Sequence, residues 1–259
     1  MKLAFLSTAL CLAGASVAAR TCQLRAADAG VQAPFAGVGD NGTQTSAGPS
    51  ATASASSSAS PSATALPAFE YGRDPVRGVN LGGWLVLEPW ITPSFFEETG
   101  NDDIIDEYTL GQHMDEDAAR KMLKNHWETW ITEQDFKDIA AAGLTHVRIP
   151  LGYWSVPMTS SDTNTSTSVS PYLDGAWPYL LRGLNWARAH GVRAIVDIHG
   201  APGSQNGYDN SGQRTGDPQF ATGADNVRRT LDTVRFLAKN IGGLVDVLEL
   251  LNEGAGFRG

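Results

Sequence analysis

From about residue 71 onward, strand-like and helix-like hydrophobic patterns alternate along the chain. Short apolar runs are typical of buried strands, and they lie at residues 76–81, 145–152, 193–198 and 245–251. Longer segments carry apolar residues at helical spacing, and they lie at residues 132–143, 175–190 and 226–240. The alternation predicts parallel strands joined by helices, which is an α/β fold.

Capping and breaking residues set the expected boundaries of these elements. Thr132 is expected to cap the first of these helices, with Asp135 completing a capping box and Gly143 ending the helix. Pro150 is expected to end the second strand. The third helix is expected to carry one apolar face, formed by Val227, Leu231, Val234 and Leu237. The segment between the first strand and Thr132 is predicted to be a long polar and aromatic loop.

Residues 1–19 have the form of a secretory signal peptide. Lys2 precedes an apolar stretch from Leu3 to Gly14, and the small residues Ala18 and Ala19 suit cleavage. The apolar stretch is shorter than the roughly 20 residues that a membrane-spanning helix needs. We therefore expect a secreted protein with no membrane attachment after cleavage.

Residues 20–69 have a different composition from the rest of the chain. They are rich in Ala, Ser, Thr, Gly and Pro, and such a segment cannot bury enough surface to offset the entropy of ordering it. We expect a disordered, O-glycosylated stalk there and a folded domain at residues 70–259. Asn41 and Asn164 begin candidate N-glycosylation sequons. Removal of the leader would leave Cys22 as the remaining cysteine, so no cysteine-based metal cluster is expected.

Composition and charge narrow the range of partners. The chain has 259 residues, of which 42% are hydrophobic, and this is enough for one sizeable core. The net charge is −9, with 28 acidic and 19 basic residues, and no stretch concentrates Lys and Arg. This balance speaks against nucleic-acid binding and against docking onto anionic lipid. A neutral or weakly charged substrate fits better.

Polar residues stand at or just after the carboxyl ends of the predicted strands. They are Glu88, Arg148, His199, Asn252 and Glu253. In parallel α/β folds the loops after the strands carry the functional site. Each residue alone has a structural alternative: an internal ion pair for Arg148, a core imidazole for His199, a solvated side chain for Glu253. Their shared position at the strand ends favours one common site.

Glu253 is the best candidate for acid catalysis. Leu250, Leu251 and Asn252 precede it, and a carboxyl group in a partly apolar pocket can protonate a leaving oxygen. An asparagine directly before it can hydrogen-bond a sugar hydroxyl. Retaining glycoside hydrolysis needs a second carboxyl group about 5–5.5 Å away. Glu88 is the other candidate, but it lies on a loop, so a second catalytic carboxylate is not evident in this chain.

Aromatic residues in the predicted post-strand loops strengthen the carbohydrate interpretation. Flat rings stack on the C–H faces of sugars, and the loop aromatics are Trp84, Trp90, Tyr153, Trp154 and Tyr208. The alternative, ordinary core packing, fits the helical residues Trp127, Trp130 and Trp186 better. Asp209 and Asn210 are either turn formers or hydroxyl-binding groups.

Five longer motifs together resemble one enzyme family. They are "RGVNLGGWLVLEPWITPSFF", "DEYTLG", "HWETWITEQDFKDIAAAGLTHVRIPLGYW", "DIHGAPGSQNGYDNSG" and "LELLNE". Their order and spacing are similar to those of the fungal exo-β-1,3-glucanases of glycoside hydrolase family 5. The resemblance covers residues 71–253. It implies a TIM (β/α)8 barrel, a retaining mechanism without metal or cofactor, and release of glucose from the non-reducing ends of β-1,3-glucan.

The resemblance also implies a role for each motif residue. Glu253 would be the acid/base, and Asn252 its partner at the sugar 2-hydroxyl. Arg148 would orient the nucleophile and keep it ionised, while His199 would line the subsite of the cleaved sugar. Glu88 would grip the terminal glucose and so make the pocket blind.

The loop motif "GYDNSG" would form the pocket entrance. Tyr208 stands there where the family usually has Phe, so it would provide an aromatic clamp. Asp209 and Asn210 lie beside it and complete the substrate-binding set.

The chain departs from the family in two ways. Gly254 follows Glu253 where the family has Pro, which would relax the backbone behind the acid/base. Only about four βα units are present, whereas the barrel needs eight, and the nucleophile at the end of the seventh strand is missing. We therefore expect residues 70–259 to be the amino-terminal half of a truncated hydrolase, inactive alone.

Two alternatives remain open at the level of the sequence. One is a non-catalytic, secreted glucan-binding half-barrel, and the other is an endo-acting glucanase of the same family. For the main hypothesis we expect β-1,3-glucan as partner, no nucleic acid, a monomer, and a location outside the cell or in the cell wall, where the enzyme acts in cell-wall glucan metabolism.

Overall fold

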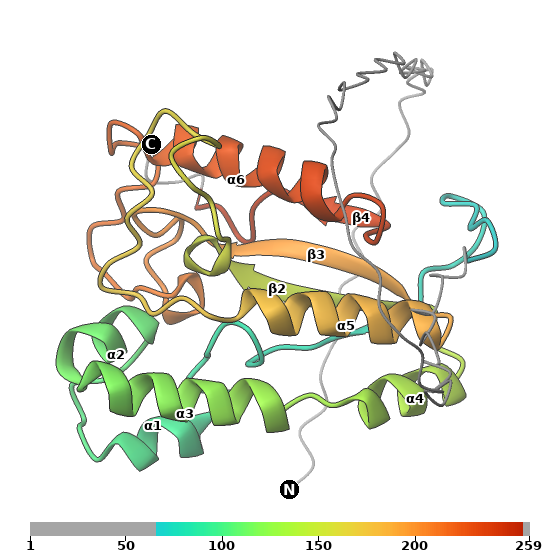
Figure 1. Ribbon diagram of the computed structural model, residues 1–259, viewed down its shortest axis with the longest axis horizontal. Helices are drawn as coiled ribbons and strands as arrows, with labels where there is room; N and C mark the ends of the chain where they lie inside the picture. The colour runs from blue at the N-terminus through green and yellow to red at the C-terminus, as the bar shows by residue number, and fades with distance from the viewer. Residues whose placement is uncertain (1–65, 256–259) are drawn as a thin grey trace, which may run out of the picture. The chain divides into compact units, whose positions relative to one another are not determined.

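A four-stranded parallel sheet lies at the centre of the computed structural model, which describes residues 66–255 (Figure 1). The strands are hydrogen-bonded in chain order, and each neighbouring pair is parallel. They are β1 (Gly78–Asn80), β2 (His146–Gly152), β3 (Arg193–Gly200) and β4 (Val247–Glu249). The prediction of an α/β fold with parallel strands is therefore confirmed.

The segments between the strands are largely helical. The helices are α1 (Pro93–Thr99), α2 (Glu107–His113), α3 (Glu116–Thr129), α4 (Glu133–Ala141), α5 (Trp177–Ala189) and α6 (Asn226–Ile241), and the short 3-10 turns are η1 (Tyr153–Ser155) and η2 (Asp209–Ser211). In Figure 1, α5 and α6 run alongside the central strands, whereas α1, α2 and α3 form a separate group that follows β1.

The main hydrophobic core lies on one face of the sheet. Alternate residues of β2 and β3 are fully buried there and join a cluster with side chains of α5 such as Leu180 and Leu184. These strand residues are Val147, Ile149, Leu151, Ala194, Val196 and Ile198. Because successive side chains of a strand point to opposite faces, the other face is left for the residues between them, and most of those are polar.

The predicted capping box at the start of α4 is present. Asp135 Oδ2 accepts hydrogen bonds from the backbone nitrogen of Thr132 at 2.7 Å and from its hydroxyl at 2.8 Å. Gly143 and Gly191 follow α4 and α5 with φ of 75° at each, the left-handed conformation that favours glycine. The chain can therefore turn sharply from each helix into the next strand.

Some strand boundaries differ from the prediction. The first and fourth strands are only three residues long, and Leu250 is 61% exposed rather than buried. Pro150 lies inside β2 and does not end it. β1 pairs with β2 only as far as Arg148, so at Pro150 the strand β2 has, among the described strands, only β3 as a neighbour. Proline is tolerated there because it lacks a backbone N–H and one side of the strand needs no donor.

The segment predicted to be one long loop contains α1, α2 and α3. Local capping explains α2, because Asp106 Oδ1 accepts a hydrogen bond from the backbone nitrogen of Thr109 at 2.7 Å. A proline at the first position starts α1. The prediction overlooked these start signals because aromatic and polar residues obscure the helical period.

The predicted apolar face of α6 is only partly buried. Leu237 is buried and Val234 is partly buried, but Val227 and Leu231 are 45% and 49% exposed. The amino-terminal half of the helix instead buries Thr230 and Thr233. The four residues therefore do not form one continuous buried face.

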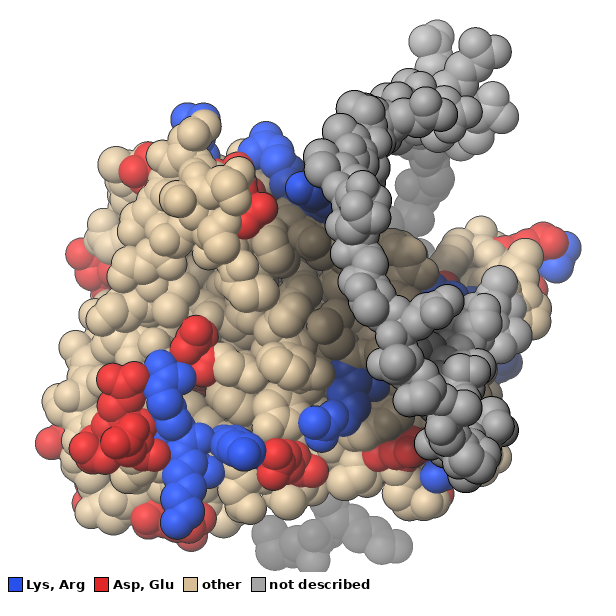
Figure 2. Space-filling view, in the orientation of Figure 1, with Lys and Arg blue, Asp and Glu red and all other residues tan. Residues whose placement is uncertain are grey.

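Several expectations concern residues outside the described range. The leader, most of the stalk, Cys22 and the sequon at Asn41 all lie there, whereas Asn164 is described and exposed. Among residues 66–255, no helix combines the length and apolar character of a bilayer-crossing segment. On the face drawn in Figure 2, basic side chains are interspersed with acidic ones.

Candidate active site

The polar face of the sheet brings polar side chains from all four strands to one place. The register aligns Asn80 with Arg148, and Asp197 with Glu249. Arg148 is opposite Ile195, two residues before Asp197. Since residues two apart share a face, Asn80, Arg148, Asp197 and Glu249 all project from the same side of the sheet.

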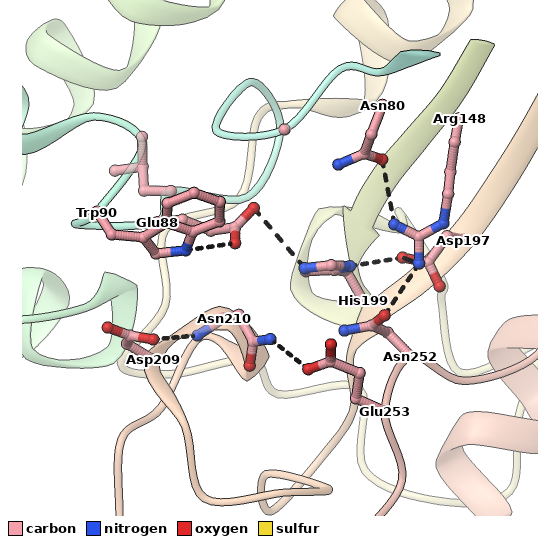
Figure 3. A network of polar contacts seen from close by, with 12 residues as sticks. Asn80, Glu88, Trp90, Arg148, Asp197, His199, Asp209, Asn210, Asn252 and Glu253 are labelled. Carbon is pink, nitrogen blue, oxygen red and sulfur yellow. Dashed lines mark hydrogen bonds and ion pairs between the residues drawn. The ribbon is translucent and has the colours of Figure 1, made fainter. Parts of the chain in front are cut away.

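Arg148 is at the centre of this polar cluster (Figure 3). Its Nε and Nη2 donate to the two carboxylate oxygens of Glu249 at 2.7 and 3.0 Å, which is a bidentate pair. Nη2 also lies 2.8 Å from Asp197 Oδ2 and donates to Asn252 Oδ1 at 3.0 Å. Nη1 donates to Asn80 Oδ1 at 3.1 Å. The guanidinium thus joins groups from β1, β3, β4 and the segment after β4.

A second line of contacts runs from Asp197 to Glu88. Asp197 Oδ2 lies 2.6 Å from His199 Nδ1, and His199 Nε2 lies 3.8 Å from Glu88 Oε1. All three side chains are buried. Trp90 Nε1 donates to the other oxygen of Glu88 at 3.2 Å. Glu88 therefore lies at the polar cluster, although it comes from the loop after β1 and not from a strand tip.

Burial and neighbouring charges set the ionisation of these carboxyl groups. Burial raises the pKa of Glu88, against the opposing effect of His199. Burial also raises the pKa of Asp197, although His199 and Arg148 favour its ionised form. The hydrogen bond from Arg148 lowers the pKa of Glu249. Glu249 is thus held as a carboxylate, while the two buried carboxyl groups bind protons more readily.

Four buried polar atoms of the cluster have no hydrogen-bond partner among the described residues. They are Glu88 Oε1, Asp197 Oδ1, His199 Nε2 and Asn252 Nδ2. A buried polar atom without a partner costs about 1–3 kcal/mol, and native structures contain few of them. Their concentration at the strand ends indicates a site that a polar ligand with several hydroxyl groups would complete.

Asn252 and Glu253 follow β4 directly. The backbone nitrogen of Asn252 donates to the carbonyl of Ile198 at 2.9 Å, which fixes the segment to β3. Glu253 is exposed, and its Oε2 accepts a hydrogen bond from Asn210 Nδ2 at 2.8 Å. Its φ of 45° is an uncommon, strained value for a residue other than glycine. The expected apolar pocket around Glu253 is not formed by residues 66–255, because Leu250 points into solvent.

The predicted loop aromatics fall into two groups. Trp90 and Tyr208 are 74% and 60% exposed, so they can still stack on a ligand. Trp84, Tyr153 and Trp154 are buried, and their prediction as stacking residues was wrong. Trp84 donates a hydrogen bond to the carbonyl of Trp127 in α3, and the rings of Tyr153 and Trp154 pack against Tyr172. Asp209 accepts a hydrogen bond from the backbone of Asn210 at 2.9 Å and therefore shapes the turn.

Sequence reasoning missed three side chains of the cluster and one residue that supports it. Asp197, Glu249 and Asn80 are all bound to Arg148. Gln205 is buried, and its Nε2 donates to the carbonyls of His199 at 2.6 Å and Asn252 at 3.0 Å. A signal for the two acidic residues was present, since each is a charged residue within a short apolar strand, but their pairing with Arg148 depends on the register of the folded sheet.

A further hollow among the described residues lies away from the polar cluster. It has a volume of about 430 Å³ and lies between α1 and α3, against Phe95, Met114, Met122 and Trp130. The buried polar atoms without a partner do not include any from its lining. The polar cluster, and not this hollow, is therefore the candidate active site.

Comparison with known proteins confirms the resemblance seen in the motifs. No family model matches the chain. A glucan 1,3-beta-glucosidase of Blumeria graminis is 49% identical over 194 residues, which is 73% of this chain and 43% of the relative. A probable glucan 1,3-beta-glucosidase A of Aspergillus fumigatus is 49% identical over 69% of the chain and 41% of the relative. Glucan 1,3-beta-glucosidase 2 of Wickerhamomyces anomalus is 44% identical, with 73% and 44% covered.

Solved structures support the fold. The rutinosidase of Aspergillus niger superposes with a TM-score of 0.59 at 24% identity, over 69% of this chain and 49% of that one. A second structure, AoRut, gives a TM-score of 0.60 at 26% identity, over 69% and 48%. The chain thus spans less than half the length of each of these relatives.

Proposed function

We propose that the protein carrying this chain is a retaining glycoside hydrolase of the TIM-barrel type that releases glucose from the non-reducing ends of β-1,3-glucan. One observation carries the proposal: the polar cluster at the strand ends joins Glu88, Arg148, His199 and Asn252 around unpartnered buried atoms. The similarity to glucan 1,3-beta-glucosidases across the same residues supports this substrate class.

Glu253 is assigned the role of acid/base. Its carboxyl group is exposed beside the cluster, where a leaving oxygen can approach it, and Asn210 holds one of its oxygens. Asn252 is fixed by Arg148 through its Oδ1, so its Nδ2 is oriented as a free donor. That donor suits the hydroxyl next to the reacting carbon. The strained φ of Glu253 fits a side chain whose direction matters.

Glu88 and His199 are assigned to the terminal glucose. Their free atoms, an acceptor oxygen and a ring nitrogen, are 3.8 Å apart, so both can bind neighbouring hydroxyls of one sugar. Trp90 and Tyr208 offer exposed rings to the same ligand. Glu88 is buried, which supports a pocket that is closed at this end. A closed pocket admits only the end of a glucan chain, and this favours exo action.

The nucleophile is assigned to a residue outside 66–255. Within that range, the carboxylate of Glu249 is hydrogen-bonded to Arg148. The carboxyl group of Asp197 contacts both His199 and Arg148. We therefore place the second carboxylate in a later βα unit of a complete barrel, within reach of Arg148. The remaining proposals are a secreted monomer, free of the membrane, that acts on cell-wall glucan.

Product analysis tests the proposal. The full protein would be incubated with β-1,3-gluco-oligosaccharides reduced at one end, and the products followed by chromatography and by proton NMR. Glucose as the first product, initially as the β-anomer, is expected for a retaining exo-enzyme. Larger fragments as first products would indicate endo action, and binding without hydrolysis would indicate a glucan-binding protein. Either result would overturn the proposal.

A covalent trap tests where the nucleophile lies. A 2-deoxy-2-fluoro-glucoside with a good leaving group slows the breakdown of the glycosyl-enzyme intermediate. Peptide mapping of the trapped full protein is expected to find the label on a Glu beyond residue 255. A label on Glu88, Asp197 or Glu249 would contradict the assignment.

A further inference from the structure

A buried glutamate in the first turn of α2 is hydrogen-bonded to a residue that adjoins the candidate site. Glu107 is 3% exposed. Its Oε1 accepts a hydrogen bond from the backbone nitrogen of Leu87 at 2.7 Å, and its Oε2 accepts one from Trp154 Nε1 at 2.9 Å. Leu87 directly precedes Glu88 in the chain. One carboxyl group therefore connects the loop after β1 to the turn after β2.

The indole of Trp154 is itself fixed in place. It stacks on Tyr172 with ring centroids 4.2 Å apart and an interplanar angle of 5°. A Cβ atom added at Gly152, Gly200 or Gly212 would lie within 2.4 Å of the Trp154 ring. The ring thus fills the space over the ends of β2 and β3. Glu107 is consequently attached to a rigid part of the molecule.

The residues on either side of Glu107 hold the loop after β3. Asp106 Oδ2 accepts a hydrogen bond from the backbone nitrogen of Arg214 at 2.6 Å. The backbone nitrogen of Tyr108 donates to the carbonyl of Gly212 at 2.9 Å. Residues 106–108 therefore contact the loops after β1, β2 and β3.

We propose that Glu107 is a positioning residue that fixes Glu88 relative to His199 by clamping the backbone of Leu87 against Trp154. The clamp acts close to its target, because Leu87 is the residue before Glu88. The carbonyl of Glu88 accepts hydrogen bonds from the backbone nitrogens of Ile91 and Thr92, so a tight turn begins at Glu88. The side chain of Glu88 enters the site from this turn. The consequence for catalysis rests on the proposed function, whereas the positional role does not.

A carboxyl group suits this clamp better than its amide. Both oxygens of the ionised Glu107 accept an N–H, and these two hydrogen bonds favour the carboxylate form against the effect of burial. Burial raises its pKa to about 7, and the neighbouring Asp106 adds to the shift. The charge of Glu107 in turn contributes to the raised pKa of Tyr172, whose main cause is burial. Glu107→Gln keeps the shape, but its NH₂ group would meet one of the two N–H donors and lose that bond.

Indole N–H resonances of the full protein test the positional role without any assay of activity. The Trp154 Nε1–H signal is expected to titrate with a midpoint near 7 and to lose this titration in Glu107→Gln. The Trp90 Nε1–H signal reports on Glu88, because Trp90 donates to it. This signal is expected to shift in Glu107→Gln. An unchanged Trp90 signal beside an altered Trp154 signal would overturn the proposal.

A matched control and a second variant complete this test. Asp232 is also buried and bonded, to Thr163 and Arg235, but it lies on α6. Asp232→Asn is expected to leave the Trp90 signal unchanged, and a shift there equal to that in Glu107→Gln would refute a specific role. If Glu107→Gln does not fold, Trp154→Phe removes the other donor, and an unshifted Trp90 signal in that variant would equally overturn the proposal.

Kinetics of the full protein then test the consequence. Glu107→Gln is expected to lower kcat/KM for β-1,3-gluco-oligosaccharides about tenfold, because misplacing a substrate-binding group is costly. In a Glu88→Gln background the same change is expected to cost less than about twofold, since both act through one group. Equal losses in both backgrounds would contradict the coupling. If the wild-type protein does not hydrolyse glucan, the proposed function fails, but the NMR result still decides the role of Glu107.

Discussion

At the scale of single residues, Arg148 holds the candidate site together. Its guanidinium contacts Asn80, Asp197, Glu249 and Asn252 through three nitrogens. Removing this cation would leave buried or half-buried acids without their counter-charge, which costs more than a surface ion pair. The geometry of the whole cluster therefore depends on the planar fork of one side chain.

We predict that Arg148→Lys lowers kcat of the full protein by about 10- to 100-fold, since a lysine cannot reproduce the two-pronged contact with Glu249 or reach Asn252 at the same time. KM is expected to change by less than about threefold, because the ground-state contacts to the sugar come from other groups. Kinetics on gluco-oligosaccharides measure both. Arg235→Lys serves as the control, because Arg235 is an exposed arginine that forms an ion pair on α6. A change confined to KM would identify Arg148 as a plain substrate contact.

The pKa of Glu107 leads to a prediction about stability. Its folded-state value of about 7 lies above the ordinary value of 4.5, so the folded state binds the proton more tightly. The resulting stabilisation is fully present below pH 4.5 and is lost as the pH rises through 7. From this group alone the free energy of unfolding should fall by about 3 kcal/mol over that interval. Urea unfolding at pH 5 and pH 8 should show a smaller fall in Glu107→Gln, and identical falls would contradict the assignment.

Sequence reasoning identified the residues whose chemistry is visible in the chain itself. Glu88, Arg148, His199 and Asn252 do come together, because the carboxyl ends of parallel strands meet at one edge. Asp197 and Glu249 escaped because their importance depends on register, which pairs them only after folding. Trp154 was misjudged because burial by distant segments, here α2 and Tyr172, leaves no local signal.

At the scale of elements, the strands and the helices α4, α5 and α6 were predictable, and their exact ends were not. Helical period and capping residues are local, so Thr132 with Asp135 predicts the start of α4. The lengths of β1 and β4 depend instead on what pairs with them, and no local pattern contains that information. Val227 and Leu231 on α6 are exposed for a similar reason. The helical pattern shows which residues share a face, but it does not show whether another surface covers that face.

Close contact between the strand ends and Trp154 predicts a cost for added volume. A Cβ atom at Gly200 would lie 2.4 Å from the Trp154 ring and 2.6 Å from the carbonyl of Ser211. Gly200→Ala is therefore expected to destabilise the protein by about 1–3 kcal/mol through overpacking. Gly243→Ala, where nothing lies within 4 Å, is the matched control. Unfolding midpoints would be compared, and equal effects of the two changes would contradict the packing described here.

At the scale of the whole molecule, residues 66–255 supply a candidate acid/base and a polar cluster on one face of a four-stranded sheet, for which we propose sugar binding. The relatives of this chain are more than twice as long as the aligned part. On the proposed barrel, further strands would cover the polar face and bring the second carboxylate to Arg148. The two parts would then form one site.

A chain confined to these 259 residues is accordingly predicted not to release glucose from β-1,3-glucan. Retaining hydrolysis needs a covalent intermediate on a nucleophile, which we place beyond the described range. The short chain and the full protein would be expressed in parallel and assayed on laminarin, with circular dichroism as the check of folding. Glucose release by the short chain at a rate comparable with that of the full protein would refute the placement of the nucleophile.

The proposed role of Glu253 as the acid/base of a β-1,3-glucosidase can be tested with a single variant. Glu253→Gln in the full protein would be assayed on laminarin and on an aryl glucoside whose leaving group needs no protonation. We predict that kcat/KM falls by about 10²–10⁴-fold on laminarin, the range of general acid catalysis. The rate at which the aryl glucoside glycosylates the enzyme is expected to fall far less. Equal losses on both substrates, or full activity on laminarin, would rule out Glu253 as the acid.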